Sequence, residues 1–247
     1  MRYFSSEQIS PDAVPLFRST ATEISKRAGD LGINVTPFRD FTLPLFRGLA
    51  LEMQKTILLQ LQRYLDSLRF AANAGERLDD PGRAAWSALS YLGLLPPSEF
   101  FPHLGANSIV EFYSLDGLQI WRNFEFMKLC SYTLEEVYCL KWFKRYSREA
   151  EISAACLKCV ESLLTSSEHE IIFPQIPSHV IEETCSIERL AIRMKFDMVA
   201  RLKDRQGGGL AGFAVVSTGN FLRALAEVKD HKPDLYFAPT SQPEVSP

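Results

Sequence analysis

Apolar side chains recur at intervals of three and four residues in four stretches of the chain, and this spacing places them on one face of an α-helix. The stretches are residues 13–28, 43–72, 85–92 and 148–165. Stretch 43–72 is the longest, and at about 1.5 Å per residue it predicts a helix of about 45 Å. Stretch 148–165 keeps to the helical spacing without a miss, so we expect a second long helix there.

The predicted helix 43–72 carries two separate apolar stripes. One recurs at steps of three and four residues, and the other repeats every seven residues at Leu51, Leu58 and Leu65. Two stripes require two partners. One partner is the helix predicted over 85–92, and the other is either an element of the same chain or the same helix of a second copy. Leu51, Leu58 and Leu65 are therefore candidate homodimer contacts, with an intramolecular bundle as the alternative.

Other stretches have the pattern of β-strands. Residues 109–115 and 118–122 are apolar-rich runs around Asp116-Gly117, a pair that favours a hairpin with a two-residue primed turn because glycine tolerates positive φ. Residues 188–203 alternate between apolar and polar side chains, which predicts a strand with one buried face. That face is expected to hold Leu190, Ile192, Met194, Phe196 and Met198. Helices together with antiparallel strands predict the α+β class.

Prolines and glycines divide the chain. Pro96-Pro97 ends the helical pattern, because consecutive prolines cannot continue a helix. We therefore predict an N-terminal helical module over residues 1–97, a second domain over 107–222 that ends in a short helix from residue 220, and a disordered proline-containing tail over 230–247.

A group of residues after the hairpin follows a known family pattern. Asn123 and Phe126 precede Tyr132-Thr133-x-Glu135-Glu136, in which Thr133 and Glu136 have the spacing of a helix capping box. With the Trp142 segment, the long helix and the closing Gly-Phe-x-Val-Val run, residues 107–218 resemble a PAS sensor domain. Ser131 stands where the family often has glycine, and residues 175–186 form a longer excursion than a minimal PAS domain needs.

The resemblance implies a five-stranded antiparallel sheet with flanking helices and a pocket between them. The residues expected to face the pocket are Phe126, Cys130, Trp142, Met194 and Phe196. These large side chains either fill the pocket or enclose a small apolar ligand. The cysteine motif of flavin-binding members is absent, and the predicted helix 148–165 contains no histidine that could bind haem. We therefore expect no cofactor, with flavin bound without the cysteine motif as the alternative.

Composition limits the classes of function. The 247 residues carry a net charge of −3, which gives no electrostatic footprint for nucleic acid. No apolar run reaches the roughly 18 residues that a membrane helix needs. Five cysteines, an odd number, argue against a secreted disulfide framework. We expect a cytoplasmic protein.

Few residues suggest chemistry. Cys156 and Cys159 have C-x-x-C spacing, but they fall in the middle of an apolar helix face, which favours packing over redox or metal chemistry. Cys185, His169 and His179 could complete a zinc site but lack a characteristic spacing. No catalytic motif is present, and we predict no metal site. Four basic residues on the strand 188–203 form either a solvated face or a surface for an acidic partner: Arg189, Arg193, Lys195 and Arg201.

The function expected from these observations is non-enzymatic. The first hypothesis is a signalling or regulatory PAS-like protein that acts through protein–protein contacts and self-association. The second is a sensor that binds a small apolar molecule in the PAS-like pocket, and the third is an enzyme of unrecognised type.

Overall fold

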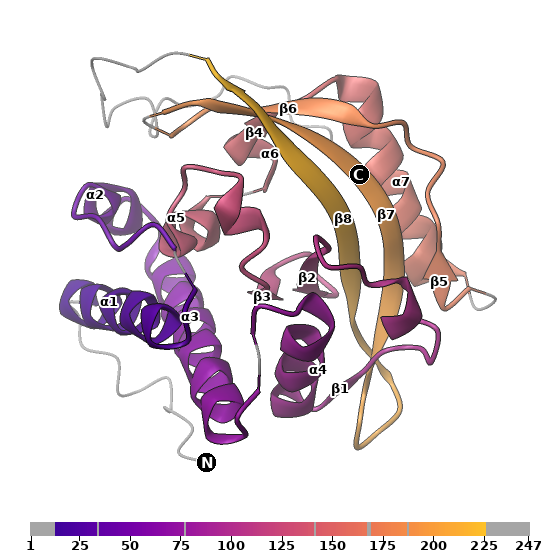
Figure 1. The fold of residues 1–247 in the computed structure, drawn as a ribbon, viewed down its shortest axis with the longest axis horizontal. Coiled ribbons are helices and arrows are strands. Elements are labelled where there is room, and N and C mark those ends of the chain that lie inside the picture. The colour runs from indigo at the N-terminus through magenta and orange to yellow at the C-terminus, as the bar shows by residue number, and fades with distance from the viewer. Residues whose placement is uncertain are drawn as a thin grey trace.

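A strongly curved antiparallel β-sheet arches through the molecule, with helices on both of its sides (Figure 1). The computed structural model describes residues 13–33, 35–76, 78–140, 142–166, 169–186 and 188–225, without the side chains of residues 142 and 143. The α+β class predicted from the sequence is confirmed. No helix within these ranges is long and apolar enough to cross a membrane.

The strands form one eight-stranded sheet in the described part of the chain. Its path is β3-β2-β8-β7-β6-β4, and β1 and β5 pair with β7. The strands are β1 Leu94–Leu95, β2 Ile109–Ser114, β3 Gln119–Arg122, β4 Tyr146–Ser147, β5 Ile171–Ile172, β6 His179–Glu183, β7 Leu190–Asp204 and β8 Leu210–Ala224. The two 15-residue strands β7 and β8 form the spine of the sheet.

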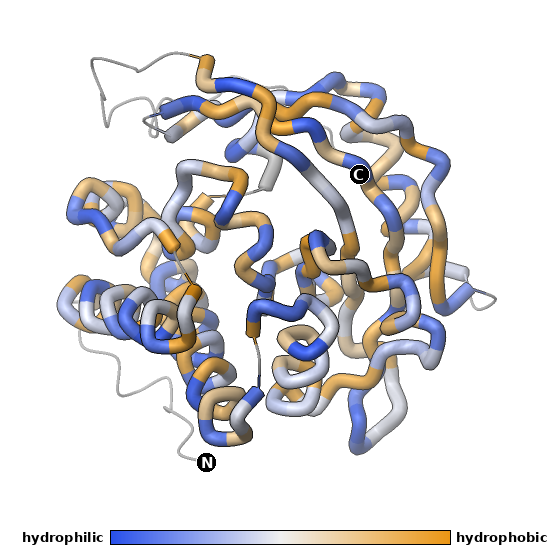
Figure 2. Tube along the Cα trace, viewed as in Figure 1, coloured by the Kyte–Doolittle hydropathy of each residue, from blue (hydrophilic) through white to orange (hydrophobic). Residues whose placement is uncertain are grey.

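Helices cover the sheet unequally. α1 Val14–Asp30, α2 Thr42–Arg47, α3 Leu51–Asn73 and α4 Pro81–Leu92 lie on its concave side, with α5 Leu134–Cys139 near them, and α7 Ala150–Thr165 lies on the opposite side of β7 (Figure 1). The short elements are the 3₁₀ turns η2 Phe101–His103 and η3 Phe126–Lys128 and the helix α6 Trp142–Arg145. Figure 2 shows apolar and polar residues alternating along these helices and along β7 and β8.

An aromatic stack joins the N-terminal helices to the hairpin. The Phe112 and Trp121 rings stack at 4.9 Å, and Tyr64 of α3 lies 6.4 Å from Trp121. The Tyr64 hydroxyl donates a 2.8 Å hydrogen bond to the carbonyl oxygen of Arg122. Buried residues of the helices and the sheet form one continuous hydrophobic cluster. The predicted domain division near residue 97 stays a prediction, but the two parts share this core.

The predicted helix 43–72 is interrupted. α2 ends at Arg47 with Gly48 as its C-cap, and Ala50 has an extended ψ of 147° before α3 begins. Leu58 and Leu65 are 4% and 3% exposed inside this chain's own core, whereas Leu51 is 52% exposed. The intramolecular alternative therefore accounts for Leu58 and Leu65, and a dimer contact through them would require repacking. Self-association stays a prediction.

The predicted final helix is wrong over its first residues. β8 continues to Ala224, which pairs with Leu190 of β7. The partner strand satisfies the backbone groups of residues 220–224, and this overrides their weak helical pattern. The remainder of that predicted helix and the predicted tail 230–247 lie outside the described residues.

The long strand β7 does not keep one apolar face. Its register against β8 shifts between Phe196 and Met198, so two residues on one strand oppose one on the other. Phe196 packs on the α7 side of the sheet, and Met198 lies in the cluster on the concave side. The shared face predicted for these two residues is therefore wrong, because a bulge reverses the alternation between them.

The hairpin β2–β3 is confirmed, but its turn is not a two-residue primed turn. The amide of Ser114 donates to the carbonyl of Leu118, and the amide of Gly117 donates to the carbonyl of Ser114, so the loop has three residues. Gly117 alone in this loop has positive φ, at 75°. This is the geometry of a three-residue loop closed by a left-handed glycine.

Substituting Gly117 with valine should destabilise the protein by about 1–2 kcal/mol, because a β-branched residue is strained at this φ. Urea unfolding measures the change. Gly29→Ala is the matched control: Gly29 lies in α1 with open space around an added Cβ, so alanine should leave stability unchanged or raise it slightly. An unfolding midpoint for Gly117→Val equal to that of the wild type would show that this turn does not require glycine.

The predicted capping box at the start of α5 is confirmed. The Thr133 side chain accepts from the amide of Glu136, and the Glu136 carboxylate accepts from the amide of Thr133 at 2.7 Å. Glu135 beside it is also buried, and its Oε1 has no hydrogen-bond partner among the described residues. Burial raises the pKa of each carboxyl group to about 7.

Glu135→Gln should stabilise the protein at pH 8 and have little effect at pH 4.5. In the folded state Glu135 keeps its proton up to about pH 7, whereas in the unfolded state it loses the proton near pH 4.5, so this group makes stability fall as pH rises through that window. Glutamine removes the penalty, which is on the order of 1–3 kcal/mol. Urea unfolding at the two pH values measures the difference, and Glu151→Gln on the exposed side of α7 is the control. Equal destabilisation by Glu135→Gln at both pH values would contradict the assigned penalty.

Candidate ligand cavity

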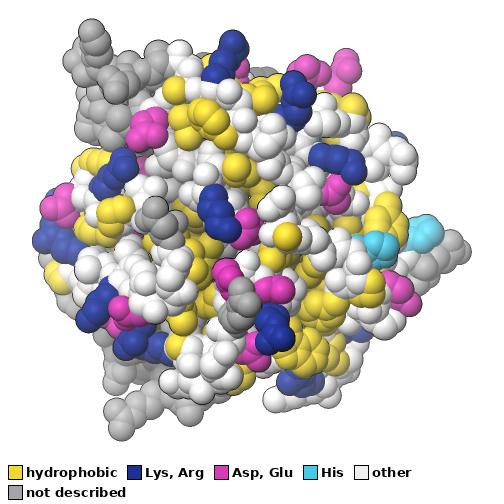
Figure 3. All heavy atoms as spheres, in the orientation of Figure 1, with side chains coloured by type: hydrophobic (Ala, Val, Ile, Leu, Met, Phe, Trp, Pro, Cys, Tyr) yellow, Lys and Arg dark blue, Asp and Glu magenta, His cyan; other side chains and the backbone are white. Residues whose placement is uncertain are grey.

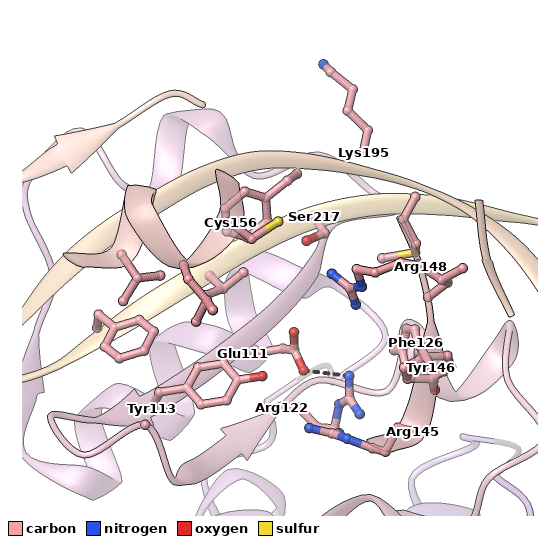
Figure 4. Close-up of a pocket in the computed structure, with 18 of the residues that line it drawn as sticks. Glu111, Tyr113, Arg122, Phe126, Arg145, Tyr146, Arg148, Cys156, Lys195 and Ser217 are labelled. Atoms are coloured by element: carbon pink, nitrogen blue, oxygen red, sulfur yellow. Dashed lines mark hydrogen bonds and ion pairs between the residues drawn. The ribbon is translucent and has the colours of Figure 1, made fainter. Parts of the chain in front are cut away.

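A cavity of about 410 Å³ lies between α7 and the sheet (Figure 4). Its volume falls within the range of about 300–1,000 Å³ typical of small-molecule sites. Six apolar residues line the α7 end of this space: Leu157, Val160, Leu164, Phe196, Phe213 and Val215. The Tyr113 ring stacks on Phe213 at 5.2 Å and continues this apolar wall toward the hairpin.

Strand alternation places charged side chains on the cavity side of the hairpin. Glu111 and Arg122 are direct cross-strand partners, as are Phe112 and Trp121. Because neighbouring residues point to opposite faces, Phe112 and Trp121 enter the concave core while Glu111 and Arg122 line the cavity. Arg145 reaches the same space from the end of α6.

These groups form a connected network. The Glu111 carboxylate accepts from Arg122 Nη2 at 2.7 Å and from Gln119 Nε2 at 3.0 Å. Gln119 Oε1 in turn accepts a longer bond of 3.3 Å from Arg145 Nη1. The Arg122 guanidinium also stacks over the Phe126 ring, 4.3 Å from its centroid. Arg122 is thus held between a carboxylate and an aromatic face.

Several donors in the network are unused. Nε and Nη1 of Arg122 and Nε of Arg145 are buried and have no hydrogen-bond partner among the described residues. A buried donor without a partner costs about 1–3 kcal/mol, and more when the group is charged. The two arginines therefore retain hydrogen-bonding capacity that a bound molecule or ordered water could use.

Arg122 stays cationic despite its burial. Burial lowers the pKa of its guanidinium, but the charge of Glu111 and the neighbouring Tyr113 raise it, and the net pKa lies above the usual value. Burial is also the main reason why the pKa of the Tyr113 hydroxyl is raised, so this group remains a neutral phenol. The polar end of the cavity combines the positive charges of the arginines with the Glu111 carboxylate and the neutral Tyr113 hydroxyl.

The sequence located part of this cavity. Phe126, Met194 and Phe196 line it, whereas Cys130 is buried but is not among its lining residues. Burial raises the pKa of the Cys130 thiol to about 12. The side chain of Trp142 lies outside the described residues.

Sequence reasoning missed the charged residues of the cavity: Glu111, Arg122, Arg145 and Arg148. A signal for the first two was present. Glu111 interrupts an otherwise apolar strand, and Arg122 closes the facing strand at the position that the hairpin register pairs with it. No such pattern marks Arg145 or Arg148, which the chain brings in from beyond α5.

The basic row predicted on β7 is not one surface. Arg201 donates to the carbonyl oxygens of Leu163, Leu164 and Ser166, so it caps the C-terminus of α7. Lys195 pairs with Asp197 at 2.9 Å. On the face seen in Figure 3, basic and acidic side chains are interspersed and hydrophobic side chains gather toward the middle. Arg201 therefore has a structural role that a solvated row would not give it.

The cysteines and histidines are dispersed. Within the described ranges, no group of three or more His, Cys, Asp or Glu side chains could hold a metal ion. Cys156 is buried and lines the cavity. Cys159, on the same helix, packs against a cluster of five buried residues: Tyr113, Leu163, Val199, Phe213 and Val215. Both thiols are free.

No protein-family model matches the sequence, and no curated protein matches it. The assignment of a function therefore depends on the geometry of the chain itself.

Cys156 and Cys159 should react slowly with N-ethylmaleimide in the native protein. Burial raises the pKa of both thiols, that of Cys159 to about 11, so few thiolates exist at pH 7. Peptide mass spectrometry should show both residues labelled at least about tenfold more slowly in native than in urea-unfolded protein. Rapid native labelling of either thiol, or one bound zinc per chain, would contradict the packing role.

Proposed function

We propose that this chain is a small-molecule sensor of PAS-like architecture. In this proposal a ligand binds between α7 and the sheet, and its binding changes the packing of the N-terminal helices. The observation that supports this function most strongly is the cavity of about 410 Å³, with apolar walls and buried arginines at one end. Pockets with apolar walls and a few convergent polar groups are the usual form of ligand sites.

Several features support the PAS-like part of the proposal. Within the eight-stranded sheet, the consecutive strands β3-β2-β8-β7-β6 are antiparallel, and we take these five as the counterpart of a PAS-like sheet. The long helix α7 packs against β7, and the capping box at Thr133 stands at the start of α5. The additional strands β1, β4 and β5 would be extensions of that five-stranded core.

Arg122 offers a direct route from ligand to helix. Its guanidinium lines the cavity, and its carbonyl oxygen accepts the hydrogen bond from Tyr64 of α3. A ligand that displaces the Arg122 side chain would therefore act on the strand to which α3 is attached. Such a ligand shifts the equilibrium between two arrangements only by its difference in affinity for them.

Protein–protein contact is the second function that we propose, as the output of the sensor. Trp86 of α4 is exposed beside Phe101, and Phe70 of α3 is exposed beside Tyr91. Exposed aromatic side chains are enriched where proteins bind one another. These residues lie on the helical part of the chain, where a partner would sense a change in α3.

A neutral apolar dye tests the cavity function. N-phenyl-1-naphthylamine should bind the full chain saturably at one site, with increased and blue-shifted fluorescence, because the apolar walls exclude water from the dye. Val160 of α7 lines the cavity, and Val160→Phe should fill the space and weaken binding about tenfold or more.

Ala154→Phe is the matched control for this substitution. It adds the same ring to the exposed side of the same helix, so dye binding should remain as in the wild type. The function would be wrong if the wild type showed no saturable binding, or if Val160→Phe bound the dye as well as Ala154→Phe. Circular dichroism of each variant establishes that it is folded.

A further inference from the structure

We infer that the ligand of this cavity is an organic acid, with its carboxylate held by Arg122 and Arg145 and an apolar body packed between α7 and the sheet. This inference rests on the proposed sensor function and adds to it the chemical class of the ligand.

Unused donors at the polar end carry the inference. Arg122 and Arg145 are 1% and 4% exposed and both line the cavity. Nε and Nη1 of the first and Nε of the second have no hydrogen-bond partner among the described residues. Figure 4 shows the two guanidinium groups next to each other below Glu111. Carboxylates match guanidinium donors in charge and geometry.

The charge balance inside the cavity also favours an anion. The buried Arg122 and Arg145 face a single internal carboxylate, that of Glu111 (Figure 4). Lys195 points away from the space and pairs with Asp197, while Asp116 lies in the exposed hairpin turn and accepts from the Ser114 hydroxyl. The interior therefore has more positive than negative charge, and one ligand carboxylate would reduce the excess in a site that water screens weakly.

The remaining walls specify the other part of the ligand. Leu157, Val160 and Leu164 of α7 face Phe196, Phe213 and Val215 of the sheet. These side chains offer no hydrogen-bonding groups, so a sugar or a polyacid would lose hydration there without replacement. An alkyl or aromatic body attached to one carboxylate satisfies both ends of the cavity.

Octanoate and 1-octanol test the inference, because they share a chain and differ in the head group. Isothermal titration calorimetry of the full chain at pH 7.5 should show octanoate binding about tenfold or more tightly than octanol. Arg145→Met should remove this preference while retaining octanol binding. Arg145 is chosen because its loss does not leave Glu111 without its Arg122 partner.

Glu111→Gln provides a test that misfolding cannot imitate. The amide can still accept from Arg122, but the competing negative charge is gone. Octanoate should therefore bind several-fold more tightly than to the wild type, with octanol unchanged. With octanol binding retained as evidence that the variant is folded, an octanoate affinity equal to or weaker than that of the wild type would count against the inference, and this comparison decides the matter if Arg145→Met does not fold.

The outcomes separate the two proposals. Equal affinities for octanoate and octanol in the wild type would overturn the organic-acid inference and leave the sensor cavity in place. Failure of the neutral dye to bind would overturn the proposed function itself, and octanoate and octanol should then fail to bind as well. Native mass spectrometry of freshly purified protein adds a direct readout: a co-purified acid supports the inference, and a co-purified neutral or basic molecule overturns it.

Discussion

The burial of Arg122 is the constraint on which the centre of the molecule depends. Its backbone carbonyl binds Tyr64 on the concave side of the sheet, and its side chain binds Glu111 and stacks on Phe126 on the other side. A buried charge is tolerated only with a partner, so β2 and β3 must keep the register that sets Glu111 opposite Arg122. That register also places Phe112 against Trp121, and this stack is where α3 packs.

Two other buried polar side chains, Asn123 and Glu183, are closely matched to their partners. Asn123 accepts from the amide of Val110 and donates to the carbonyl of Ser108, which fixes the chain on both sides of β2. The Glu183 carboxylate accepts from the amides of Ser131 and Leu190 and from the hydroxyls of Ser131 and Ser186. Arg122 and Arg145 differ from these two groups, because they leave three buried donors without a partner among the described residues. Single atoms of Thr42, Ser87, Glu135 and Tyr146 are also unpartnered, but only the two arginines combine a fixed charge with a place on the cavity wall.

Local patterns in the sequence predicted the elements that are determined by residues close together in the chain. The Asp116-Gly117 hairpin, the capping box at Thr133, the helix α7 and the strand β7 each follow from residues close together in the chain. Features imposed by a distant partner were not predictable. The extension of β8 to Ala224 depends on pairing with β7, and the bulge that separates Phe196 from Met198 depends on the register of the same two strands.

The same distinction explains the cavity. Its apolar wall could be foreseen in part, because Phe126, Met194 and Phe196 belong to periodic stretches. The meeting of Arg145 with Arg122 could not be foreseen, because it arises only after α5, α6 and β4 fold back against the hairpin. A sequence pattern shows which face of one element is apolar. A cavity forms where the faces of several elements meet, and the pattern of a single element does not show that meeting.

The position of Arg122 also limits how a ligand could act. An anion bound to its free donors would leave the Glu111 pair intact and stabilise the arrangement already present. An anion that replaced Glu111 at Nη2 would instead release this carboxylate, whose other neighbour is Gln119. Gln119 is bonded to Arg145, and Arg145 leads directly into β4, which pairs with β6. Replacement would thus loosen one edge of the sheet, whereas addition would not. Addition would therefore act by stabilising the present arrangement, whereas replacement would also break contacts that lead toward β4 and α3.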